Sequence, residues 1–244
     1  SSPVVVNEPE LFRWAGWNTP PTLVERFEQL SDLSSNSIAE QAHSMDADLA
    51  FIRRTQAGAL VAADKVRQAA ARRPDQRFPS GPLGAQLQML ASCLASDLPA
   101  RVFYVHLDGF DHHAHQAHSH AALLSQFARS IQAFYRELDA LGQSNRVLTL
   151  AFTEFGRRVA ENASGGTDHG TASPAFLFGP MVAPGLVGRA PSLRDGELND
   201  GDLEHTVDFR SVYAAVLDNW MNIESSRILG RRFEPADVLA SVTQ

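Results

Sequence analysis

The chain has 244 residues, of which 44% are hydrophobic and 20% charged, and its formal net charge is −7. These values are typical of a water-soluble globular protein, and the acidic balance argues against a general binder of nucleic acid or anionic membranes. A single cysteine, Cys93, excludes an internal disulfide framework and a cysteine-built zinc site. The longest uncharged apolar run, 175–188, contains two prolines and is too short to span a bilayer.

The first hundred residues are predicted to be mostly helical. Apolar residues at helical spacing over 23–30 and an alanine-rich stretch over about 37–72 indicate helices. The proline-containing segment 73–82 cannot continue a helix and is expected to be a loop, after which a further helix covers 83–96. Residues 1–80 are therefore the mostly helical part of a single domain that is predicted to span the chain.

The second half is distinguished by three short β-favouring runs at 102–107, 147–152 and 175–178. Between the first two, apolar residues repeat every three or four positions, and Gly142 follows as a helix stop. A strand, a crossover helix and a strand form a βαβ unit, and near-continuous apolar strands favour a parallel sheet covered by helices on both faces. We therefore expect an α/β fold whose sheet core, 81–244, bears the loops of the site.

Three polar loops are expected to meet at one edge of this sheet, because ligands of open parallel sheets bind beyond the carboxyl ends of the strands. The first strand runs into 108–116, the second runs into 153–158, and the third is preceded by 165–170. Six of the nine histidines lie between positions 106 and 120. Oxygen and nitrogen ligands without thiolate suit Zn²⁺, Mn²⁺ or Fe. Arg157 is the residue expected to hold an anionic substrate with its fork of donors.

Several of these side chains also have ordinary structural explanations. His118 and His120 fall at the predicted start of the crossover helix, and His106 falls inside a predicted strand. Glu154 and Arg157 can form a plain ion pair. The functional interpretation depends on the convergence of three loops, and no single motif carries it.

A metallo-β-lactamase pattern is partly matched by His113, His115 and His118. That pattern requires an aspartate directly before the last histidine, where this chain has Ala117. The predicted order of strands and helices also differs from that fold, so this interpretation is rejected.

Two segments resemble motifs of the alkaline phosphatase and sulfatase superfamily. Residues 166–169, Gly-Thr-Asp-His, precede a strand and resemble a motif of the phosphopentomutases, whose histidine binds metal. Residues 153–156, Thr-Glu-Phe-Gly, stand at a strand end and resemble the metal loop of the superfamily. The resemblance implies a parallel-sheet, alkaline-phosphatase-like core with flanking helices and a one- or two-metal site.

Four segments in order also resemble a narrower bacterial family, the family of unknown function numbered fifteen hundred and one in the DUF series. They are 108–113, 154–157, 165–170 and 206–210. The resemblance covers about residues 80–235. Because members of this family are often exported by the twin-arginine route, it implies a periplasmic or secreted location.

The resemblance also implies a bound divalent metal, zinc or manganese, with iron or calcium as alternatives. Its candidate ligands are Asp108, Asp111, His113, Glu154, Asp168 and His169. Asp108 with His112 keeps the spacing of the superfamily, whereas Asp111 with His113 fits the narrower family, and we favour the second pair. Arg157 is the candidate for anion binding.

The chain departs from the superfamily in two ways. The aspartate of the metal loop is Glu154 here, and it is followed by Phe155 instead of a metal-binding histidine or asparagine. The superfamily opens on a strand with a metal-binding aspartate and a serine, threonine or cysteine nucleophile, whereas 4–6 lead into Asn7 and Glu8. We therefore expect the chain to be the C-terminal part of a longer protein, without the N-terminal strand and nucleophile segment.

These features together predict a metal-dependent hydrolase or transferase that acts on a phosphate or sulfate ester. Its expected partner is a small anionic ester substrate, together with the missing N-terminal segment of the same protein. Nucleic acid and a membrane span are not expected. The alternative is a non-catalytic metal- or partner-binding protein that retains the fold.

Overall fold

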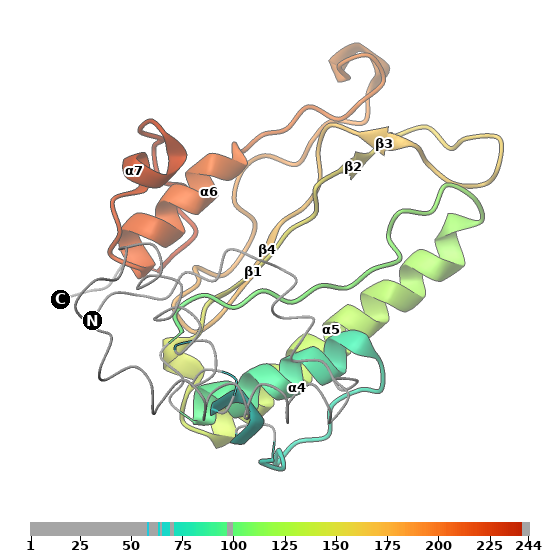
Figure 1. Cartoon of the computed structure of the whole chain (residues 1–244). Coiled ribbons are helices and arrows are strands. Elements are labelled where there is room, and N and C mark those ends of the chain that lie inside the picture. The colour runs from blue at the N-terminus through green and yellow to red at the C-terminus, as the bar shows by residue number, and fades with distance from the viewer. Residues whose placement is uncertain (1–57, 59–62, 64, 69–70, 97–99, 241–244) are drawn as a thin grey trace, which may run out of the picture. The chain divides into compact units, whose positions relative to one another are not determined.

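The structure is a computed structural model that describes residues 58, 63, 65–68, 71–96 and 100–240 (Figure 1). The chain divides into two compact units, Ser1–Arg77 with Ala85–Val105, and Phe78–Gly84 with His106–Gln244. Its elements are α4 (Pro82–Ala95), α5 (Gln116–Ala140), η1 (Ser144–Arg146), β1 (Thr149–Ala151), β2 (Gly156–Arg157), β3 (His169–Gly170), β4 (Phe176–Phe178), η2 (Asp195–Glu197), α6 (Phe209–Ala215), η3 (Val216–Trp220) and α7 (Ser225–Leu229).

Helix α4 confirms the helix predicted over 83–96. It begins at Pro82, a residue that suits the first helical position because its missing N–H would have no partner there. Its buried stripe includes Leu83, Leu87 and Ala91, which recur every four residues. In the alanine-rich stretch before it, residues 58, 63 and 65–68 are helical. The helix predicted over 23–30 lies outside the described residues.

The strand predicted over 102–107 is not formed in the described part of the chain. Exposed and half-buried residues alternate along this segment, and Val102 and Tyr104 are 70% and 68% exposed. The segment therefore has the alternating exposure of an extended chain, but a strand also needs a neighbour that accepts and donates ladder hydrogen bonds.

Helix α5 confirms the helix predicted between 102–107 and 147–152 and its stop, but it is not a crossover helix, because 102–107 is not a strand and no parallel pair is formed by the described strands. Ile131, Phe134 and Leu138 form its buried stripe, spaced three and four residues apart. The helix ends where Gly142 takes a left-handed backbone (φ +65°), and its N–H donates to the carbonyl of Asp139 at 3.0 Å. None of the described helices combines the length and apolarity that crossing a membrane requires.

The described strands pair antiparallel, in two small sheets. Strand β1 pairs with β4, with Thr149 opposite Phe178, and β2 pairs with β3. The predicted runs at 147–152 and 175–178 are therefore strands, but they do not form the expected parallel pair. The physical reason is their connection: the chain between β1 and β4 makes the β2–β3 pair and contains no crossover helix, so it returns in the opposite direction.

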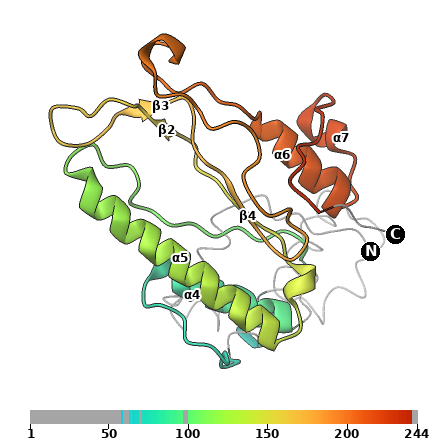
Figure 2. The ribbon, with the colours of Figure 1, turned by 180° about the vertical axis from the view of Figure 1, so that it is seen from behind.

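The β1–β4 pair lies between two helices of the second unit, and both views of the ribbon show this arrangement (Figures 1 and 2). On one side, the Tyr135 hydroxyl of α5 donates to the carbonyl of Phe178 at 2.7 Å. Phe127 of the same helix packs its ring 5.9 Å from the Phe178 ring. Beyond the end of β1, the ring of Phe152 meets Tyr213 of α6 at 6.2 Å. The second unit is thus a mixed helix and strand structure with helices on two sides of a small antiparallel sheet, and the expected parallel-sheet core is not formed by the described strands.

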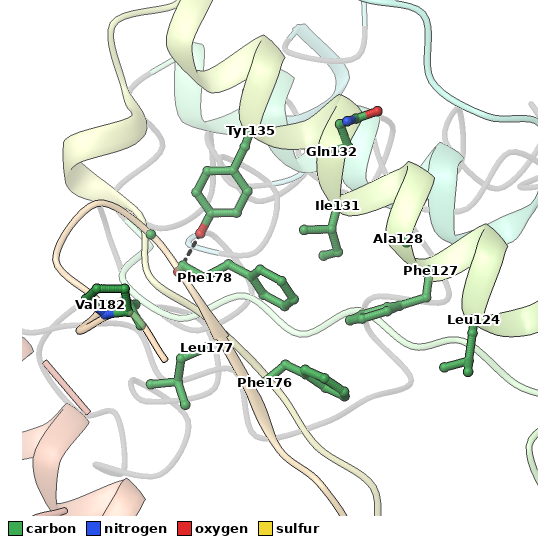
Figure 3. Close-up of a pocket in the computed structure, with 12 residues that line it drawn as sticks. Leu124, Phe127, Ala128, Ile131, Gln132, Tyr135, Phe176, Leu177, Phe178 and Val182 are labelled. Carbon is green, nitrogen blue, oxygen red and sulfur yellow. Dashed lines mark hydrogen bonds between the residues drawn. The ribbon is translucent and has the colours of Figure 1, made fainter. Parts of the chain in front are cut away.

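An open apolar groove of about 790 Å³ follows the α5 side of β4 (Figure 3). Phe127 and Tyr135 line it from the helix, and Phe176 and Phe178 line it from the strand. Phe176 remains 44% exposed there. None of the predicted site residues lines this groove.

The spacing of Val212, Tyr213, Val216, Leu217 and Trp220 in the sequence predicts an amphipathic closing helix, and α6 with its π-helical continuation η3 forms it. Val212, Ala214 and Ala215 are buried. Asp208 caps α6, because its carboxylate accepts the backbone N–H of Arg210 at 2.9 Å. The same carboxylate binds the Arg210 guanidinium through two oxygens, at 2.9 and 2.6 Å.

The Asp208–Arg210 pair predicts an acid-sensitive contribution to stability. The hydrogen bonds from Arg210 lower the pKa of Asp208 to about 2. Because the pKa is lower in the folded chain than in the unfolded one, the contribution is complete above about pH 4 and is lost as the pH falls toward 2. The variant Asp208→Asn keeps a capping oxygen but removes the charge. We expect it to unfold more easily at pH 7, by about 1 kcal/mol or less, and to match the parent protein near pH 2.

Urea unfolding of both proteins at several pH values between 7 and 2 measures this difference. A difference in unfolding free energy that stays constant over this range would contradict the prediction.

Candidate metal centre

One carboxylate and two imidazoles meet in the second unit. Asp111 Oδ1 lies 2.7 Å from His169 Nε2 and 3.1 Å from His113 Nε2. The two imidazole rings are 4.9 Å apart between centroids. Each residue offers one ligand atom within 4.8 Å of the others, and all three residues are exposed. The group can therefore surround one ion and leave part of its coordination sphere open to solvent.

The loop with the first two of these residues is fixed where α5 begins. His115 precedes the helix with a left-handed backbone (φ +48°), which is uncommon for a residue with a Cβ and turns the chain into the helix. Its N–H donates to the carbonyl of Ser164, and the N–H of Gln116 donates to that of Gly165, both at 3.0 Å. The loop before α5 is thereby held against the loop that leads to β3.

The third residue, His169, is positioned by β3. It lies opposite Arg157 in the β2–β3 ladder. The ring of Phe155 stacks on its imidazole at 4.0 Å, with 7° between the planes. This contact shields one face of the imidazole and fixes the plane of the ring, so that Nε2 is directed toward Asp111.

Asp168 contacts the group from outside. Its Oδ1 lies 3.1 Å from Nδ1 of His113, on the nitrogen that does not face Asp111. Asn162 donates to the same Asp168 oxygen at 3.2 Å and to the carbonyl of His113 at 2.9 Å. Asp168 is therefore joined to the three-residue group through His113, and it is not one of the three residues that surround the candidate ion position.

The surrounding donors keep both carboxyls ionised. The hydrogen bonds from His169 and His113 lower the pKa of Asp111. The bonds from His113 and Asn162 lower the pKa of Asp168. Both groups are therefore carboxylates at neutral pH, one as a potential ligand and the other as an acceptor for the imidazole.

Arg157 connects the loops of the site. Its guanidinium donates to the carbonyls of Thr167 and Phe110. Its carbon Cζ also lies 5.1 Å from the centre of the Phe155 ring. Thr167 directly precedes Asp168, Phe110 directly precedes Asp111, and the Phe155 ring stacks on His169. The guanidinium expected to hold an anion thus uses both of its terminal nitrogens to brace the backbone.

Replacing Arg157 by lysine distinguishes a structural role, in which the guanidinium holds two backbone carbonyls, from a role in anion binding. A lysine keeps the charge but lacks the planar fork that reaches two carbonyls, so we expect the unfolding free energy to fall by about 1–3 kcal/mol. Thermal or urea unfolding measures this loss, and Arg194→Lys, at an 83% exposed side chain, is the control. Unchanged stability together with weaker binding of phosphate would instead assign Arg157 to the anion.

Two predicted ligands lie outside the group. The Asp108 side chain is 91% exposed and lies 3.6 Å from His106. Glu154 is exposed, and it does not belong to the three-residue group. Of the six candidate ligands, the structure brings Asp111, His113 and His169 together, with Asp168 behind them.

The other clustered histidines have structural positions. His112 has its two ring nitrogens 3.0 Å from the carbonyl of Phe110 and 3.2 Å from that of Gln116. His118 and His120 lie in the first turns of α5, as expected. This accounts for most of the histidine cluster without a ligand.

Sequence reasoning missed Asn162. Its Oδ1 accepts the N–H groups of Ser164 and Gly166 at 3.0 and 3.1 Å, in addition to the two bonds that its amide nitrogen donates. An asparagine shortly before a pair of glycines, as Asn162 is before Gly165 and Gly166, signals a turn that the asparagine side chain closes by accepting backbone N–H groups. That signal was present at 162–166, but it predicts only a turn and gives no reason to connect it with the histidine loop.

The donors of the three-residue group suit a divalent transition metal. Bonds of about 2.0–2.2 Å place two ligands of a tetrahedral ion about 3.4 Å apart. The separations of 2.7 and 3.1 Å between Asp111 and the two histidines are slightly shorter, so a small outward movement admits an ion. Two imidazoles and one carboxylate with an open position are the donor set of catalytic zinc and of non-haem iron sites. Calcium, which prefers six to eight oxygen ligands, fits less well.

Comparison with known proteins gives one finding. No curated protein and no solved structure matched the chain. The family described as "Protein of unknown function (DUF1501)" matches residues 6–230, which include every residue of the site described above. The chain is therefore a member of the DUF1501 family.

Proposed function

We propose that this protein is a metal-dependent hydrolase or transferase that acts on a phosphate or sulfate ester. The observation that carries the proposal is the exposed group of Asp111, His113 and His169, which joins residues more than fifty positions apart in the sequence. Catalytic metal sites characteristically have three protein ligands and an open position, whereas structural sites are closed by four. Zinc is the first choice of metal, with manganese or iron as alternatives.

The residues of the chain would divide the work in the following way. Asp111, His113 and His169 would hold the ion, which supplies Lewis acidity to the ester oxygen and lowers the pKa of a bound water. Phe155 would keep water from one face of His169, because its ring is stacked there. The exposed side of the group would admit the anionic substrate. No described residue is assigned as a covalent nucleophile.

The remaining parts of the proposal come from the resemblance to the alkaline phosphatase and sulfatase superfamily. The Gly-Thr-Asp-His segment at 166–169, which supplies His169, supports this relationship. We extend the proposal to a core of that superfamily's type and to a periplasmic or secreted location. Helices on two sides of β1–β4 are the feature that this chain shares with such a core, whose parallel strands the antiparallel β1–β4 pair does not reproduce.

A second candidate is a non-catalytic metal- or partner-binding protein. One observation favours it: Arg157, the cation expected to bind the ester anion, donates to the carbonyls of Thr167 and Phe110 instead. A site that lacks a free guanidinium for the anion can still hold a metal.

A direct assay separates the two candidates. The purified chain is freed of metal with a chelator, reloaded with Zn²⁺ or Mn²⁺, and incubated with 4-nitrophenyl phosphate and 4-nitrophenyl sulfate, while its metal content is measured by mass spectrometry. The hydrolase predicts one bound metal and metal-dependent release of nitrophenol. Bound metal without release from either ester would reject the hydrolase in favour of the binding protein. Absence of bound metal would reject the hydrolase and the metal-binding form of the second candidate.

A further inference from the structure

We propose that Asp168 and Asn162 are positioning residues that orient His113 toward the metal, and that Asp168 is not itself a ligand. This inference rests on the proposed metal centre. It differs from the expectation based on sequence, in which Asp168 and His169 bind the metal side by side.

The first argument is the geometry of His113. The two nitrogens of an imidazole point in divergent directions, so they cannot bind the same ion. Nε2 lies 3.1 Å from Asp111 Oδ1, and Nδ1 lies 3.1 Å from Asp168 Oδ1. Asp168 therefore approaches the ring from the side away from Asp111 and His169. An ion held by Nε2 has the imidazole between itself and the Asp168 oxygen.

The second argument is the saturation of Asn162. A primary amide offers two donor hydrogens and two acceptor lone pairs. Its nitrogen donates to Asp168 Oδ1 and to the carbonyl of His113. Its oxygen accepts two backbone N–H groups, from Ser164 and Gly166. All four positions are occupied by the protein, so Asn162 has no atom left for a metal or substrate, and its effect passes through its partners.

The consequence is control of the histidine tautomer. A carboxylate that accepts from Nδ1 keeps the proton on that nitrogen and leaves the lone pair of Nε2 for the metal. Asn162 fixes both ends of this arrangement, since it bonds to the carboxylate and to the backbone of the histidine. Loss of such outer partners commonly weakens metal binding by about 10–100-fold without changing the ligands.

The test compares five variants of the whole chain, four alanine variants and Asp168→Asn. Asp168→Ala and Asn162→Ala remove the proposed positioning residues. Asp108→Ala and Asn219→Ala remove an exposed aspartate and an exposed asparagine outside the site. Zinc affinity is measured by competition with a chromogenic chelator, and the coordination number by the visible absorption of the Co²⁺-loaded proteins. The tautomer of His113 is read from ¹⁵N chemical shifts of the zinc-loaded proteins.

We expect one zinc per wild-type chain, with the proton of His113 on Nδ1. Asp168→Ala and Asn162→Ala should each lose about 10–100-fold in zinc affinity and keep the cobalt spectrum of the wild type. Asp168→Asn, which still offers an oxygen to Nδ1–H, should recover part of the loss. The two control variants should bind as the wild type does.

Two results would overturn the inference while leaving the metal centre intact. One is a changed cobalt coordination number in Asp168→Ala, which would make Asp168 a ligand. The other is unaltered zinc affinity in both Asp168→Ala and Asn162→Ala. A wild-type chain that binds no zinc and no cobalt would instead reject the metal centre, and the inference with it.

Discussion

Replacing Asp111 by alanine is expected to abolish measurable zinc binding, while replacing Asp108 leaves the affinity unchanged. Asp111 is the common partner of both histidines, at 2.7 Å from His169 and 3.1 Å from His113, and it is the only carboxylate in the three-residue group. Zinc sites with four protein ligands bind with about 10–16 kcal/mol, so one ligand contributes about 3 kcal/mol, or a factor of about 100. Loss of the one charged ligand should reach at least this factor.

Asp108→Ala is a stringent control because Asp108 is three positions away in the same loop and was the alternative candidate on sequence grounds. Its side chain is 91% exposed, and it contacts His106 rather than the group. Isothermal titration of both variants with zinc measures the difference. Equal losses of zinc affinity in Asp111→Ala and Asp108→Ala would show that zinc binding depends on the net charge of the loop and not on the position of Asp111. A loss confined to Asp108→Ala would move the metal to the aspartate-plus-four spacing with His112.

The helices were predictable because their signal repeats many times. In α5, residues such as Ile131, Phe134 and Leu138 recur over several turns, so the period survives any single exception. The stop at Gly142 was also readable, since glycine takes the left-handed backbone that ends a helix at no steric cost.

The direction of strand pairing was not predictable in this way. Strands β1 and β4 have three residues each, and such short apolar sequences suit a parallel neighbour as well as an antiparallel one. The connection decides the direction: the chain between them forms the β2–β3 pair and contains no crossover helix. An apolar run such as 102–107 likewise shows which residues suit a strand, but not whether a neighbour is in place to pair with it.

The sequence was enough to predict which types of side chain form the candidate site, but only some of the individual residues. Motif resemblance pointed to Asp111, His113 and His169, which the structure brings together. It could not exclude Asp108, because spacing within a loop does not fix the direction of a side chain. Hydrogen bonds fix that direction here, and those of Asn162 depend on contacts across about fifty residues that a linear motif does not contain.

Gly166→Ala is expected to weaken zinc binding by about 100-fold, although glycine is not needed there for its backbone angle. A Cβ at this position would lie 2.3 Å from the carbonyl oxygen of His113 and 2.9 Å from the N–H nitrogen of Ala114. Both atoms are backbone, so neither can rotate away. The histidine loop would have to move by about 1 Å, and displacements of this size in a functional site typically cost about 100-fold.

Gly166 is also hydrogen-bonded to Asn162 in both directions. Its N–H donates to Asn162 Oδ1 at 3.1 Å, and its carbonyl accepts the backbone N–H of Asn162 at 2.8 Å. The same added methyl group at Gly196 meets nothing within 4 Å, so Gly196→Ala is the matched control. Zinc titration of both variants, together with urea unfolding, measures the result. We expect Gly196→Ala to behave as the wild type and Gly166→Ala to lose affinity along with about 1–3 kcal/mol of stability. Wild-type affinity in Gly166→Ala would mean that the two loops are not in contact, and it would remove the basis for joining His113 to Asp168 and Asn162.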